Sequence, residues 1–274
     1  MAAGSGRCYE FQATGHLSIH NYLRGSTVST QFYDFEISVS NHLWHLRAVD
    51  YNVSPALDLD TGHRPPMRFP PHQRSAQNKQ RGPLSLVIVA GTDGTSVYGF
   101  STLSSETEQP TLQGFVTQGP KPTFNRDLRV IWMAFASSEY LNIPTNLSTL
   151  QPPWDIYRTE NKEYSLTAEM ERDSTSPHLP LQILFHAISK RGVSQSESKE
   201  RLVGKYCVLS RTNYEGLSIP TTCLLERFSS KATNILLSAY SVRVVAVREP
   251  TLSAYVPQPI KGMLVLDSEP SPEF

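Results

Sequence analysis

The stretch DLRVIWMAFASSEYL, residues 127–141, differs from the rest of this 274-residue chain because its apolar residues recur with a helical period. They leave the middle turns of the expected helix apolar on nearly every side, and a helix of that kind needs burial all round. In a chain otherwise rich in strands, we expect it to lie on the concave side of a strongly curved sheet. The apolar residues are Leu128, Val130, Ile131, Trp132, Met133, Ala134, Phe135 and Ala136.

Strand patterns fill most of the remaining chain. In residues 30–39 the side chains alternate between apolar and polar, which is typical of a strand with one buried side. The clearest hairpin is LSLVIVAGTDGTSVYGF, residues 84–100, in which GTDG supplies a turn between two β-prone runs. The expected strands are 9–21, 30–39, 43–49, 84–90, 96–102, 112–117, 163–171, 179–188, 203–211, 217–228, 235–247 and 263–267.

These elements predict a mainly β fold. Short turns between consecutive strands favour an antiparallel meander, and the expected sheet has about ten to twelve strands in a half-barrel or open barrel wrapped around one apolar helix. All-β units often reach this length as one domain, so we expect a single half-barrel-like domain over 1–274. The acidic, proline-bearing tail, 268–274, is expected to fray.

Residues 54–83 differ in composition from the strands around them. Six prolines among polar residues deny this segment a regular ladder of hydrogen bonds, so it reads as an insertion. Its part 61–82 is basic and carries no acid, so it is either a solvated loop or a contact for a phosphate-bearing surface. The basic residues there are Arg64, Arg68, Arg74, Lys79 and Arg81.

Net charge and hydropathy limit the kinds of partner that this chain is expected to bind. Lys plus Arg number 25 and Asp plus Glu number 25, so the chain lacks the basic excess of a nucleic-acid-binding protein, and we predict no nucleic-acid partner. No apolar run reaches the roughly 18 residues of a transmembrane helix, and the start MAAGSGRCYEFQ lacks the apolar core of a signal peptide. A processed precursor would look the same, so this start does not decide the compartment.

The common catalytic signatures HExxH, CxxC, GxxxxGK, GxGxxG and GxSxG are absent from the sequence. We therefore predict no catalytic residues, no cofactor and no enzyme activity. The alternative is an enzyme whose site is gathered only by the fold, for example around His186 or Glu169.

No metal site is predicted either. His42 and His45 lie three apart in an expected strand, which puts them on opposite faces. Glu169, Glu171 and Asp173 would share a face and could hold Ca²⁺, but the solvated side of a strand is the simpler interpretation.

Cys207 and Cys223 flank a turn centred on Glu215. With a three-residue loop they would face each other, at a separation that a disulfide can span, and a change of one residue in the loop would place them diagonally. Two alternatives follow: a disulfide, which would imply an oxidising compartment, or two reduced thiols.

The bulky apolar residues expected to point into the curve of the sheet form the candidate ligand-binding set. Either they fill an ordinary core, or they line a partly open cavity that takes a lipid or acyl chain. The set is Trp44, Phe100, Trp132, Phe135 and Tyr140.

The order of these elements resembles the half-barrel lipoprotein carriers of the LolA/LolB kind. The resemblance is carried by the hairpin LSLVIVAGTDGTSVYGF, the helix RDLRVIWMAFASSEYL and the later hairpin YCVLSRTNYEGLSIPTTCLLERF, whose turn holds Gly216 and whose return strand holds the step Ile219-Pro220. It covers 9–267 outside the insertion and concerns order, not diagnostic residues. The chain departs from the carriers in its length and in having one helix where they use several as a lid.

That resemblance implies a curved antiparallel sheet whose concave face holds acyl chains in the bacterial envelope. The expected function is a non-catalytic protein of the periplasm or cell envelope that binds an apolar ligand or a lipoprotein. The alternative from a different class is a structural or protein-interaction module with a filled core and no ligand.

Overall fold

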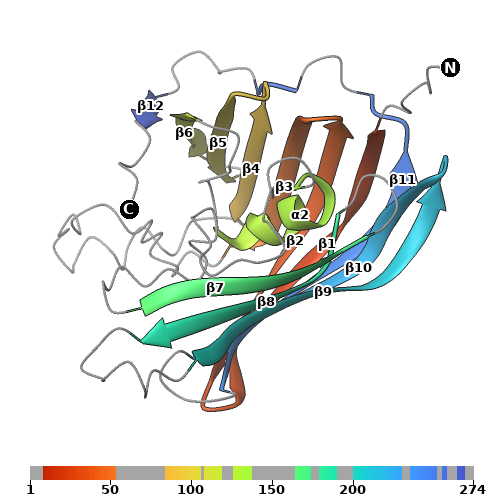
Figure 1. The fold of residues 1–274 in the computed structure, drawn as a ribbon. Coiled ribbons are helices and arrows are strands. Elements are labelled where there is room, and N and C mark those ends of the chain that lie inside the picture. The colour runs from red at the N-terminus through yellow and green to blue at the C-terminus, as the bar shows by residue number, and fades with distance from the viewer. Residues whose placement is uncertain are drawn as a thin grey trace, which may run out of the picture.

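The computed structural model describes residues 9–53, 84–105, 108–118, 126–137, 164–173, 179–189, 200–229, 235–251, 255–257 and 264–268. Most of them belong to one strongly curved sheet (Figure 1), so the predicted fold class is confirmed. The strands are β1 Glu10–Leu23, β2 Ser26–Ser40, β3 Leu43–Val53, β4 Leu84–Thr92, β5 Ser96–Ser105, β6 Glu108–Gln118, β7 Tyr164–Arg172, β8 Pro180–Ser189, β9 Glu200–Tyr214, β10 Leu217–Phe228, β11 Leu236–Arg248 and β12 Leu264–Ser268.

Two antiparallel meanders make up the sheet. Strands β1 to β6 pair in chain order, strands β7 to β11 do the same, and the two halves meet where β1 pairs with β11. Strand β12 then joins the outer side of β6 in parallel. The predicted meander is therefore correct within each half, while the seam between β1 and β11 and the parallel last strand are additions to it. Strands β7 and β12 form the two edges, so the sheet stays open.

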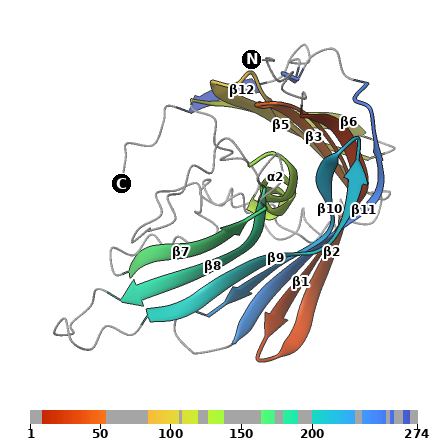
Figure 2. The same cartoon turned by 45° about the vertical axis from the view of Figure 1, so that its right-hand side comes forward.

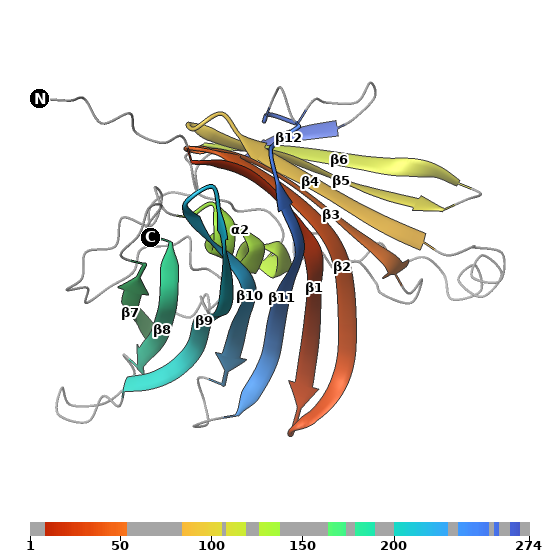
Figure 3. The ribbon, with the colours of Figure 1, turned by 90° about the vertical axis from the view of Figure 1, so that its right-hand side faces the viewer.

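The strong curvature coincides with β-bulges on neighbouring strands. The β1–β11 register shifts between Thr14 and Gly15, and the β9–β10 register shifts on both sides of Thr222. These irregularities lie close together, because Thr222 pairs with Arg243 and Arg243 pairs with His16. A bulge bends its strand and increases the local twist, and Figure 3 shows β9, β10, β11 and β1 curving around the helix.

The helical segment is shorter than predicted. A 3₁₀ turn, η1 (Arg126–Leu128), leads into helix α2 (Arg129–Phe135), which ends six residues before the expected Leu141. The Ser137 hydroxyl donates to the Met133 carbonyl at 2.7 Å, a local bond that competes with continuation of the helix. Residues 138–141 and the expected cap Asn125 lie outside the described part of the chain.

The β4–β5 turn shows why GTDG predicts a hairpin. The Asp93 carboxylate accepts from the backbone N–H of Thr95 and of Ser96, both at 2.9 Å, and Gly94 takes a φ of +91°. Burial of Asp93 acts to raise its pKa, but hydrogen bonds from Ser96, Thr95 and Tyr98 outweigh that effect and lower the pKa to about 2. The turn is therefore closed by an ionised side chain.

Residues 255–257, which lie between β11 and β12 in the chain, pack against the convex face of the sheet at Gly91. A Cβ built on Gly91 would lie 2.0 Å from the carbonyl oxygen of Tyr255 and 2.9 Å from Pro257. Only a residue without a side chain allows the two backbones to approach so closely.

Some predictions from the sequence concern residues outside the described part of the chain. The basic insertion 54–83 lies outside it, as do tail residues 269–274, while Ser268 belongs to β12. The single domain over 1–274 stays a prediction. In the described residues, no helix combines the length and hydropathy required to cross a bilayer.

Gly15 and Gly25 offer a matched pair of substitutions. A Cβ on Gly15 would meet the Arg243 carbonyl oxygen at 2.2 Å and Phe35 at 2.9 Å, whereas a Cβ on Gly25 meets nothing within 4 Å. We expect Gly15→Ala to lower the free energy of unfolding by about 3 kcal/mol or more, because backbone must move at the seam. Gly25→Ala, whose φ is +84°, should cost about 1 kcal/mol from backbone strain alone.

Urea unfolding followed by circular dichroism measures both changes. Equal losses in the two variants would show that the close packing at Gly15 does not support the seam.

Candidate functional site

Helix α2 lies in the concavity of the sheet (Figure 2) and contacts β2, β10 and β11. Every residue of Arg129–Phe135 is buried, so no side of the helix faces solvent. Seven residues are too few for a helix to be stable alone in water, and its stability must come from this packing. The expectation of an apolar helix inside a curved sheet is confirmed.

Tyr9 fixes the C-terminal end of the helix. Its hydroxyl donates to the Phe135 carbonyl at 2.7 Å, in a buried position. Its backbone is held in turn by Asn41 in the β2–β3 turn, since Asn41 N–H donates to the Tyr9 carbonyl at 2.7 Å and Tyr9 N–H donates to the Asn41 side chain at 3.3 Å. Burial raises the pKa of Tyr9 well above its ordinary value, so its hydroxyl keeps its proton as a donor.

Aromatic rings surround the same end of the helix. Phe135 lies 6.2 Å from Phe11 and 6.1 Å from Phe35 between ring centroids, and Tyr9 lies 5.2 Å from Phe11. Edge-to-face and tilted pairs at such distances contribute beyond simple burial. The concave face around α2 is thus an apolar, aromatic-rich surface that the helix covers.

The structure brings together three of the five residues predicted to line the concave face. Trp44, Trp132 and Phe135 are at most 1% exposed and belong to one hydrophobic cluster. Tyr140 lies outside the described residues.

Phe100 is placed differently from the prediction. Trp44 pairs with Thr92 and Thr92 with Val97, so Val97 shares the face of Trp44. Phe100 is three residues further along β5, which puts its half-buried side chain on the convex face. The sequence shows that β5 alternates, but the face is decided by its pairing register with β4.

A polar group lies on the concave face beside the N-terminal end of the helix. Tyr33 is 3% exposed, and its pKa is raised, first by burial and then by the negative charges of Asp127 and Asp50 and by Tyr240. Asp127 belongs to η1, which directly precedes α2. The concave face therefore changes from aromatic at one end of the helix to polar at the other.

A second polar cluster on β10 and β11 was not identified from sequence. Arg227 pairs with Ser238 across the two strands, and the Arg227 guanidinium donates from Nη1 to the Tyr240 hydroxyl at 3.3 Å. Ser238 is 2% exposed and Tyr240 3%. No linear motif marks these residues, because they converge only through the register of two strands.

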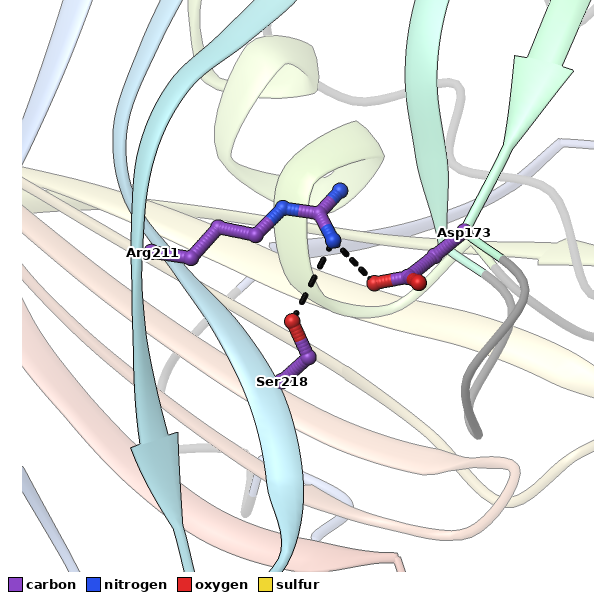
Figure 4. A network of polar contacts seen from close by, with 3 residues as sticks. All are labelled: Asp173, Arg211 and Ser218. Carbon is purple, nitrogen blue, oxygen red and sulfur yellow. Dashed lines mark hydrogen bonds and ion pairs between the residues drawn. The ribbon is translucent and has the colours of Figure 1, made fainter.

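An ion pair fastens the β7–β8 hairpin to the β9–β10 hairpin (Figure 4). Arg211 of β9 pairs through Nη1 with Asp173, just after β7, and the same nitrogen donates to the Ser218 hydroxyl of β10 at 3.2 Å. The Asp173 side chain is 8% exposed and that of Arg211 26%. Glu169 and Glu171 are exposed as expected, but Asp173 is buried, so the three carboxylates do not form one solvated row.

The cysteine register differs from the one that a disulfide needs. Cys223 pairs with Val208 while Cys207 pairs with Leu224, so the two side chains point to opposite faces, and both cysteines are free. The two-residue turn Glu215-Gly216, in which Tyr214 pairs with Leu217, sets this offset, because the two register shifts around Thr222 cancel before Cys223. Burial raises the pKa of Cys223 to about 12, with the Tyr206 hydroxyl 3.5 Å from its sulfur.

No group of three or more His, Cys, Asp or Glu side chains with the spacing of a metal site occurs among the described residues. Glu169 and His186, the residues named for an enzyme alternative, lie on β7 and β8. They sit on the convex side, because the concave side of β8 carries buried Ile183 and Phe185.

Comparison with known proteins gives a structural likeness only. No protein-family model matches the chain, and no curated protein matches it. Among solved structures, a LolA superfamily protein from Nitrosomonas europaea is 12% identical with a TM-score of 0.33, covering 89% of this chain and 87% of that one. A DUF1329 family protein from Desulfovibrio piger is 10% identical with a TM-score of 0.26, covering 90% and 88%.

The weak resemblance to LolA-like half-barrels that the sequence indicates is thus found again by structure.

Tyr9→Phe tests the anchor of α2. Removing the hydroxyl leaves the Phe135 carbonyl buried without its donor, and we expect the free energy of unfolding to fall by about 1–2 kcal/mol. Tyr51→Phe is the control, because Tyr51 is 56% exposed and should tolerate the change. Chemical denaturation measures both, and an unchanged midpoint for Tyr9→Phe would contradict the anchoring role.

A double-mutant cycle tests the ion pair. Arg211→Met leaves the buried Asp173 carboxylate without its cation, and we expect a loss of about 3 kcal/mol in the free energy of unfolding. Arg211→Met combined with Asp173→Asn should recover at least half of that loss, because the uncompensated charge is gone. Additive losses in the double variant would mean that the two side chains do not interact.

Proposed function

We propose that this protein is a non-catalytic binding protein whose concave face holds an apolar ligand, such as a lipid or acyl chain, in the place that α2 occupies here. In the ligand-bound state the helix moves aside and the ligand covers the surface around Phe11, Phe35 and Trp44. Binding then relies on burial of apolar area, at about 25 cal/mol per Å².

The observation that carries this proposal is the burial of α2 on every side inside an open, curved sheet. The helix has seven residues, and its C-terminal end is held by one hydrogen bond from Tyr9 and by the ring contacts of Phe135 with Phe11 and Phe35. Such an element is held in the concavity by apolar packing, which an apolar ligand can replace.

The location and the nature of the cargo extend this proposal. The sequence resemblance to half-barrel carriers supports a site of action in the periplasm or cell envelope, and a lipid-modified protein is an alternative form of the same cargo. The absence of known catalytic motifs from the sequence supports binding in preference to catalysis.

A second candidate function is an interaction module with a permanently filled core. It is favoured by the burial of Trp44, Trp132 and Phe135, each at most 1% exposed. In that case α2 never leaves, and partners bind the outside of the molecule.

An environment-sensitive apolar dye separates the two candidates. We expect the wild-type protein to bind the dye and to release it to long-chain lipids, and native mass spectrometry to detect co-purified lipid. Tyr9→Phe weakens the docking of α2, so it should tighten dye binding by roughly fivefold to thirtyfold, the equivalent of about 1–2 kcal/mol.

Tyr51→Phe again serves as the control and should leave dye affinity unchanged. If the wild-type protein and Tyr9→Phe both fail to take up dye, and no lipid mass is found, the permanently filled core is the correct description.

A further inference from the structure

The concave faces of β10 and β11 are otherwise apolar, but hydrogen-bond donors lie together at one place on them. Ser238 and Tyr240 are two residues apart on β11 and therefore share a face, and Arg227 of β10 lies directly opposite Ser238. This face is the concave one, since it also carries the buried residues Val242 and Leu225. These donors, Arg227, Ser238 and Tyr240, are called the donor cluster below.

Two hydroxyls of the donor cluster, those of Ser238 and Tyr240, lack an acceptor among the described residues. The Arg227 guanidinium donates to the Tyr240 hydroxyl, which leaves the proton of Tyr240 available, and within the described residues that proton has no acceptor. The Ser238 hydroxyl is 2% exposed and has no hydrogen-bond partner in this part of the chain. A buried hydroxyl without a partner is costly, and in native proteins it commonly marks a position that another molecule satisfies.

Apolar residues of β11 and β1 lie next to the donor cluster on the concave face. Tyr240 pairs with Ile19 of β1, and Val242, on the same face, pairs with Leu17. Ile19, Leu17 and Val242 are each at most 1% exposed and belong to the hydrophobic cluster that surrounds α2. The concave face thus presents hydrogen-bond donors beside a continuous apolar surface. This arrangement fits an amphiphile with one polar head group.

The charge of the ligand's head group follows from the character of these donors. One guanidinium and two hydroxyl protons favour a group that only accepts hydrogen bonds, and a carboxylate has that property. The acids Asp50 and Asp127 lie near enough to Tyr33 of β2 to raise its pKa, and both already have partners. They offer no second site for the head, and a cationic head at the donor cluster would meet Arg227.

We propose that the concave face binds a single-chain amphiphile with a carboxylate head, with the head held by Arg227, Ser238 and Tyr240 and the chain lying over Ile19 and Leu17. The inference rests on the proposed function and names the class of its ligand. Arg227 supplies charge as well as a donor, and its other contacts are retained.

Competition against the bound dye tests this head-group site, with laurate and dodecanol as probes of equal chain length and acetate as the head alone. We expect the wild-type protein to bind laurate at least tenfold more tightly than dodecanol, since a charge-assisted hydrogen bond is stronger than a neutral one. Acetate should not compete, because it has no chain to bury.

Substitutions then assign the preference. Arg227→Gln and Ser238→Ala should each reduce the affinity for laurate, roughly tenfold for Arg227→Gln, while leaving that for dodecanol unchanged. Arg243→Gln is the matched control, because Arg243 is an exposed arginine on the other face of β11. Tyr240→Phe provides a third variant if Arg227→Gln fails to fold.

The outcomes distinguish the two levels of the proposal. Equal binding of laurate and dodecanol, or a laurate preference that survives Arg227→Gln, Ser238→Ala and Tyr240→Phe, would overturn the head-group site and leave apolar binding intact. Failure of both probes and of the dye would overturn the proposed function itself.

Discussion

Helix α2 has to be buried on all sides, and this requirement shapes the rest of the molecule. Its seven residues carry apolar side chains on every face apart from Arg129, so a flat sheet would leave half of them in water. The sheet instead curves around the helix, with bulges at the β1–β11 seam and in the β9–β10 hairpin where the bend is needed. Tyr9 then ties the end of the helix to the start of β1.

The concave face has an aromatic part, which packs against the helix, and a polar part. The aromatic end, with Phe11, Phe35 and Trp44, stabilises the helix by packing, whereas the side toward Tyr33 and Tyr240 holds buried polar groups. Burial of polar groups costs free energy unless they are paired, so an accumulation of them on one side of an apolar concavity calls for a functional account. Recognition of an amphiphile gives that account, because polar and apolar surface are then both needed.

Sequence patterns predicted the strands themselves far better than they predicted which strands pair with each other. All twelve expected strands are found, because alternation and turn residues such as those around Asp93 are local signals. The β1–β11 seam, the parallel β12 and the convex position of Phe100 depend on register and on pairing between distant segments, which leave no local trace. Bulges add to the difficulty, since each one disturbs the pairing of the residues around it, as at Thr222.

The seam between β1 and β11 has a consequence for biosynthesis. Gln12 and Arg248, which are hydrogen-bonded across it, are 236 residues apart in sequence. While the ribosome completes the chain, the first meander therefore emerges with the edge of β1 open and without the strands that complete its curve. Such an unpaired edge favours association with other nascent chains. Productive folding of the N-terminal half must therefore be late, or be protected until nearly the last strand has been made.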